Sequence, residues 1–144
     1  MNKGINILVT SLLLTVGSSF LCAWSGKAFT KEEVDLVCKT VSCEANTQDA
    51  ETQYMVALTV LNRLENGNMG DSIHDVVYYE NAYSVTKWKT FEETDYSETT
   101  WLSVLRALEE NTHPEDMYYF RTNHYHNFGQ PYMVSDDLYF STED

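Results

Sequence analysis

Basic residues are scarce in this chain. Its 144 residues include 9 Lys and Arg against 22 Asp and Glu, which gives a formal net charge of −13. Such an acidic protein repels polyphosphate, so the composition excludes nucleic acid as an expected partner. The sequence also lacks internal repeats and low-complexity linkers, and its length suits one compact domain.

The N-terminus has the pattern of a secretory signal. Lys3 precedes an apolar stretch over residues 7–23, and Gly26 and Ala28 are small residues spaced as before a cleavage site. We therefore predict a signal peptide over residues 1–28 and an exported domain over residues 29–144. Loss of Lys3 and Lys27 would take the net charge from −13 to −15. The alternative is a retained anchor, since about 18 apolar residues can just span a bilayer.

Cysteine is also rare, with three residues in the chain. Cys22 would leave with the signal, so Cys38 and Cys43 form the one pair available in the mature chain. Residues five apart on a regular helix have Cα atoms about 8.6 Å apart, beyond disulfide reach. We expect two thiols, or a bridge if the helix is broken there, and no spacing typical of a zinc site is present.

Three long helices are indicated by caps and apolar spacing. Thr30 and Glu33 form a capping box that predicts a helix over residues 31–45, with an apolar stripe from Val34 to Ala45. Residues 48–64 are apolar on most sides, which is typical of a central core helix. Ser97 caps a third helix whose apolar positions follow helical spacing through Leu108.

The remaining segments predict a small amount of other structure. Residues 72–78 favour a short capped helical turn, and residues 80–96 indicate a long loop. Residues 117–121 and 138–141 are rich in aromatic residues and favour short strands, with a turn-prone segment at 123–131 between them. The predicted fold class is α+β, mostly helical, in a single domain with short β segments near the C-terminus.

Glu44 is the first candidate for chemistry, because it lies about 75° from the centre of the first helix's apolar stripe. This flank position predicts partial burial, which disfavours the carboxylate, raises its pKa and suits a group that donates a proton near neutral pH. The ordinary alternative is a solvated carboxylate or one paired with Lys or Arg.

Several blocks of the sequence resemble the SleB-type, or spore-cortex-lytic, cell wall hydrolases. Cys43-Glu44-Ala45 resembles the family's acidic-alanine motif, and an apolar helix ending in Asn62-Arg63 follows it. The matching blocks, in the family's order, are residues 41–45, 56–63, 72–79, 82–84, 107–109 and 117–120.

The resemblance implies a lysozyme-like fold and an enzyme that acts on peptidoglycan glycan strands. It places Glu44 at the catalytic glutamate of a lytic transglycosylase, which cleaves the bond between N-acetylmuramic acid and N-acetylglucosamine and closes an anhydro ring. No cofactor is implied. Ordinary hydrolysis would instead need a second carboxylate about 5 to 9.5 Å away. The candidates are Asp49, Glu51, Asp71 and Asp75.

Three positions depart from the family pattern. Gln48 and Thr52 stand where the family often has a glutamate and a glycine, and Asp137 stands where it commonly has a histidine. These departures motivate a second hypothesis, in which the chain is a non-catalytic peptidoglycan-binding module that retains the fold.

Tyrosines are the candidates for a glycan groove, because aromatic faces pack on sugar C–H surfaces. We predict Tyr83, Ser84, Tyr118 and Tyr119 as substrate-binding residues, with the alternative that several tyrosines are core. Tyr78, Tyr79 and Tyr125 are further candidates.

Two other features are candidates for sites. His124 and His126 would suit a metal-dependent amidase, but a third ligand at a recognisable spacing is missing, so we expect no metal. Arg63 would orient a carboxylate or serve as a structural cap or ion pair. The expected protein is a secreted, cell-wall-associated monomer.

Overall fold

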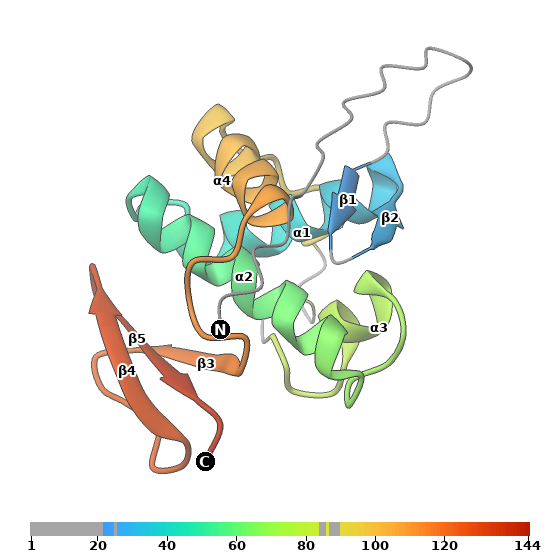
Figure 1. Cartoon of the computed structure of the whole chain (residues 1–144). Helices are drawn as coiled ribbons and strands as arrows, with labels where there is room; N and C mark the ends of the chain where they lie inside the picture. The colour runs from blue at the N-terminus through green and yellow to red at the C-terminus, as the bar shows by residue number, and fades with distance from the viewer. Residues whose placement is uncertain (1–21, 25, 84–85, 87–89) are drawn as a thin grey trace.

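The structure, a computed structural model, describes residues 22–24, 26–83, 86 and 90–144. A short hairpin of β1 (Cys22–Trp24) and β2 (Lys27–Phe29) precedes the helices α1 (Lys31–Ala45), α2 (Ala50–Asn66), α3 (Ile73–Tyr78) and α4 (Glu98–Glu109). The strands β3 (Met117–Thr122), β4 (Gln130–Ser135) and β5 (Leu138–Thr142) complete the fold. Figure 1 shows the other helices gathered around α2, with the three-stranded sheet along one side of it. The predicted α+β, mostly helical class is confirmed.

Helix α2 is the centre of the core. Every residue from Thr52 to Leu64 is buried, as expected for a helix that is apolar on most sides. The Asp49 side chain accepts a hydrogen bond from the Thr52 backbone N–H at the start of the helix. Gly67 ends it with a φ of 76°, a left-handed conformation that glycine adopts without strain.

The other helices also begin where the sequence predicts. Thr30 and Glu33 form the expected capping box of α1, and Ser97 caps α4. Because α1 continues unbroken past both of its cysteines, Cys38 and Cys43 are free thiols, as expected.

The C-terminal strands form an antiparallel sheet in the order β3-β5-β4. The sequence predicted β3 and β5 but missed β4. Residues 130 and 131, at the end of the turn predicted at 123–131, are the first two residues of β4. The reason is that β4 is an edge strand whose side chains are mostly exposed, so its sequence lacks a buried alternating face. Pro131 fits an edge strand because it has no N–H to donate.

Most of the predicted signal peptide lies outside the described residues, so residues 1–28 remain a prediction. Within the described part, Cys22 pairs with Phe29, and the Phe29 side chain is buried. A cleavage after Ala28 would therefore cut within β2. Among the described residues, no helix has the length and apolar character needed to cross a membrane.

Candidate functional site

Glu44 lies in the last turn of α1 with its side chain half-buried, as its flank position predicted. Burial raises the pKa of its carboxyl, and the positive charge of Arg63 offsets part of that rise. A carboxyl that is partly removed from water yet still reachable suits a proton donor.

Arg63 connects three segments around Glu44. Its side chain is 8% exposed near the end of α2, and its Nε donates a hydrogen bond to the Tyr118 backbone oxygen on β3 at 2.8 Å. Its guanidinium lies 4.8 Å from the centre of the Tyr83 ring. Its Nη1 is buried and has no hydrogen-bond partner among the described residues. Arg63 is therefore both a structural link and a source of positive charge near Glu44.

Tyr83 does not offer its ring to a groove in this structure, because it is 2% exposed. Burial raises the pKa of its hydroxyl, and the charge of Arg63 opposes that rise. Tyr83 supports the Arg63 guanidinium, which corrects the prediction that it binds substrate directly. Ser84, the neighbouring candidate, lies outside the described residues.

Tyr118 and Tyr119 are both half-buried on β3. The Tyr118 hydroxyl accepts a hydrogen bond from Asn66 Nδ2 at 3.1 Å, which ties it to the end of α2. The Tyr119 ring meets the Phe128 ring edge-on, with centroids 5.1 Å apart. Tyr118 is thus the predicted groove tyrosine that lies beside Arg63, while Tyr119 extends toward the β3–β4 loop.

The candidate second carboxylates have structural roles. Asp49 caps α2 and Asp75 caps α3. Hydrogen bonding to Arg106 lowers the pKa of Glu51, which also contacts His113. Hydrogen bonding to Ser72 lowers the pKa of Asp75. Asp49, Glu51 and Asp75 are therefore engaged in helix caps or an ion pair, and Asp71 is exposed.

The three departures from the family pattern lie together at one contact. Gln48 Nε2 donates to Asp137 Oδ1 at 2.8 Å, and the Thr52 and Ser135 hydroxyls lie 2.6 Å apart. Asp136, which the sequence did not single out, accepts from the Asp49 backbone N–H at 2.8 Å and from Thr52 Oγ1 at 3.1 Å. The β4–β5 turn thereby docks on the α1–α2 junction, which directly follows Glu44.

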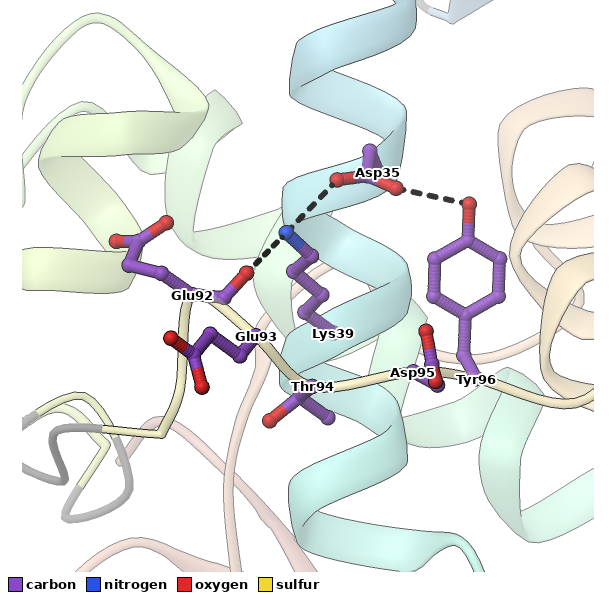
Figure 2. Close-up of a pocket in the computed structure, with 7 residues that line it drawn as sticks. All are labelled: Asp35, Lys39, Glu92, Glu93, Thr94, Asp95 and Tyr96. Atoms are coloured by element: carbon purple, nitrogen blue, oxygen red, sulfur yellow. Dashed lines mark hydrogen bonds and ion pairs between the residues drawn. The ribbon is translucent and has the colours of Figure 1, made fainter.

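The loop before α4, residues 92–95, also contacts α1. Ser42 Oγ donates to the Asp95 backbone oxygen at 2.8 Å, and Cys43 Sγ lies 3.5 Å from Thr94 Oγ1. Figure 2 shows this segment running along α1, with Lys39 Nζ reaching the Glu92 backbone oxygen at 2.7 Å and Asp35 at 3.2 Å. These contacts fix the turn of α1 that carries Glu44.

Two hollows in the described part of the structure lack Glu44 in their lining. The hollow in Figure 2 has a volume of about 490 Å³ and is lined by Asp35, Lys39 and residues 92–96. A second, of about 420 Å³, lies beside α3 between Asn68 and Tyr79.

The two histidines that were candidates for metal binding, His124 and His126, are not grouped with a third ligand among the described residues. His124 is exposed, whereas His126 stacks on Phe128 and its Nε2 lies 3.3 Å from the Phe120 backbone oxygen. In the described part of the chain, no three His, Cys, Asp or Glu residues are grouped to hold a metal ion.

Comparison with known proteins assigns the family. A sequence model described as Cell Wall Hydrolase matches residues 47–140 of this chain. The chain belongs to the cell wall hydrolase family. By class it is therefore a peptidoglycan-degrading enzyme, and the resemblance read from the sequence is confirmed. The match begins three residues after Glu44, so it does not include this residue.

The fold of this cell wall hydrolase is shared with two solved structures. The catalytic domain of the Bacillus cereus SleB protein has a TM-score of 0.70 at 15% identity, covering 79% of this chain and 92% of that one. The catalytic domain of the germination-specific lytic transglycosylase SleB from Bacillus anthracis has a TM-score of 0.69 at 14% identity, covering 79% and 97%. The predicted lysozyme-like fold is confirmed. A search of curated proteins finds no match.

Proposed function

We propose that this cell wall hydrolase is an exported lytic transglycosylase in which Glu44 is the acid and base. The observation that carries the proposal is the half-buried Glu44 carboxyl, whose pKa is raised by burial. Three of the four other candidate carboxylates are already used in caps or ion pairs. A mechanism that needs one carboxyl fits this arrangement better than one that needs two.

In the proposed reaction, Glu44 first donates its proton to the glycosidic oxygen between N-acetylmuramic acid and N-acetylglucosamine. The bond from that oxygen to the anomeric carbon breaks. Glu44, now ionised, accepts the proton of the sugar's own hydroxyl as that oxygen bonds to the same carbon and closes the anhydro ring. The proton is restored to Glu44, and no water enters the products.

The proposed surroundings of the glycan include Tyr118 and Tyr119, with Ser84 as a further candidate. Arg63 would tune the charge of Glu44, and Tyr83 would support Arg63. We further propose that the enzyme acts outside the cytoplasmic membrane, where peptidoglycan lies, as a monomer that binds no nucleic acid.

The test is digestion of purified peptidoglycan by the wild type, by Glu44→Gln and by Glu109→Gln, with mass spectrometry of the released fragments. Glu109 is an exposed glutamate at the end of α4 and is the matched control. The wild type and Glu109→Gln should release anhydro-muropeptides, and Glu44→Gln should release none. Equal release by Glu44→Gln would overturn the role of Glu44, and reducing-end products from the wild type would overturn the transglycosylase mechanism.

The second candidate is a peptidoglycan-binding module without catalysis, motivated by Gln48, Thr52 and Asp137. The docking of the β4–β5 turn gives these residues a structural role, which favours the enzyme. Sedimentation of the wild type with insoluble peptidoglycan, without release of any soluble fragment, would favour the binding module.

A further inference from the structure

An aromatic surface covers the side of β3 and β5 that faces away from the paired Phe120 and Phe140 rings. Tyr119 and Arg121 alternate with Phe120 along β3, and Tyr139 lies directly opposite Arg121 on β5. The β3–β4 loop adds further rings at positions 125, 126 and 128. We name this surface the aromatic face; it consists of Tyr119, Arg121, Tyr125, His126, Phe128 and Tyr139.

The rings of the aromatic face are held in place by one another. Phe128 stacks on His126 with centroids 4.6 Å apart and meets Tyr119 edge-on at 5.1 Å. Tyr125 and Tyr139 make a second edge-on pair at 5.1 Å. Even so, Phe128 remains 48% exposed, so its ring is fixed and also accessible. A fixed ring loses little conformational entropy when a ligand stacks on it.

The backbone keeps the loop close to the strand. Gly129 has a φ of 71°, and a Cβ at this position would meet the Thr142 backbone oxygen at 2.5 Å and Tyr119 Cδ2 at 3.3 Å. Only glycine therefore allows this approach. The loop presents Phe128 in one orientation instead of burying it.

The chemistry of the aromatic face fits a glycan strand with attached peptides. Aromatic rings pack on the C–H faces of sugars. Arg121 is exposed and can pair with a stem-peptide carboxylate. Because the chain has a net charge of −13, an anionic wall polymer is repelled by the protein as a whole. The aromatic face has no carboxylate among its residues and includes the positive charge of Arg121, so an anionic polymer can bind there without local repulsion.

The aromatic face continues from the candidate site. The Tyr119 ring lies 6.2 Å from the Tyr118 ring, and the Tyr118 backbone oxygen accepts the Arg63 hydrogen bond beside Glu44. The aromatic face therefore begins beside the residue of β3 whose backbone contacts Arg63.

We propose that the aromatic face binds peptidoglycan strands beyond the bond that is cut and holds the enzyme on its insoluble substrate. Phe128 stacks on a sugar ring, and Arg121 pairs with a peptide carboxylate. The identity of the polymer rests on the proposed function.

The experiment measures co-sedimentation with insoluble peptidoglycan in the Glu44→Gln background, so that binding is measured without cleavage. Phe128→Ala should weaken binding about tenfold, and Phe128→Trp should restore it. Leu102→Ala is the matched control, because Leu102 is 56% exposed on α4. Its binding should equal that of the parent. Circular dichroism checks that each variant is folded.

Chitin, which has sugars without peptides, separates the two contacts. Phe128→Ala should weaken binding to both polymers, whereas Arg121→Gln should weaken binding to peptidoglycan alone, with the loss disappearing at high salt. The proposal is overturned if Phe128→Ala binds like the parent or if Leu102→Ala loses as much. Soluble fragments are assayed in the same samples, so that their release by the Glu44→Gln parent reports a failure of the Glu44 assignment, whereas equal binding of Phe128→Ala and its parent reports a failure of the aromatic face.

Discussion

Removing the Asp136 carboxylate should loosen the sheet from the helical body. Asp136 Oδ2 accepts two hydrogen bonds at the start of α2, from the Asp49 backbone N–H at 2.8 Å and from Thr52 Oγ1 at 3.1 Å. Asp136 has a φ of 50°, so alanine would add backbone strain to the loss of the carboxylate. Asp136→Gly avoids that strain and isolates the carboxylate.

The expected loss follows from these contacts. A buried hydrogen bond to a charged group contributes about 1.5–3 kcal/mol, and since Asp136 is exposed we take about 1 kcal/mol for each of the two. The charge beside the N-terminus of α2 adds roughly 0.5 kcal/mol. The free energy of unfolding should therefore fall by about 2.5 kcal/mol, which lowers the Tm of a domain of this size by about 10 °C.

Thermal unfolding followed by circular dichroism measures this loss. Asn123→Gly is the matched control, because Asn123 is also exposed and left-handed, with a φ of 70°. Its Tm should stay close to that of the wild type. A Tm of Asp136→Gly that differs from the wild-type Tm by less than about 1 °C, which is roughly the error of the measurement, would show that the Asp136 contacts do not stabilise the docked turn.

Four further predictions concern α1 and the residues around Glu44. Arg63→Met should raise the pKa of Glu44, since the Arg63 charge lowers it, and should therefore move the alkaline limb of the kcat/KM profile to higher pH. Arg63→Lys keeps the charge and should leave this limb in place. An unmoved limb in Arg63→Met would contradict the prediction. Either variant should lose about 1–3 kcal/mol of stability, measured by urea unfolding, because the Tyr118 oxygen loses its Nε donor. Burial raises the folded pKa of Glu44, so the contribution of Glu44 to stability should fall as pH rises above about 4.3. The Tm of Glu44→Gln should therefore rise relative to that of the wild type over that range but not below it. Burial raises the pKa of Cys38 to about 12, so a thiol reagent should label Cys43 in the folded protein and leave Cys38 unlabelled, as peptide mass spectrometry would show.

The helices could be predicted because their signals are local. The Thr30 and Glu33 cap, the Ser97 cap and the apolar character of α2 each lie within a few residues of the element that they define. The position of Glu44 on the flank of α1 follows from the same helical spacing. These features depend on neighbours in sequence and not on the tertiary fold.

The contacts that complete the site could not be predicted, because they join distant residues. Arg63 meets Tyr118 across 55 positions, and Gln48 meets Asp137 across 89. Polar contacts of this kind leave no periodic pattern in the sequence. The groove role predicted for Tyr83 depended on its position in a family block, whereas its burial depends on how the loop after α3 packs.

The central claim is that the fold raises the pKa of Glu44 and thereby favours its protonated form. The most direct measurement is an NMR titration of protein labelled with ¹³C at the glutamate carboxyl, in which the Glu44 signal is assigned by its loss in Glu44→Gln. The account predicts a midpoint above the ordinary glutamate value of about 4.3. A midpoint at or below that value would contradict it, because burial in the fold would then not favour the protonated carboxyl of Glu44.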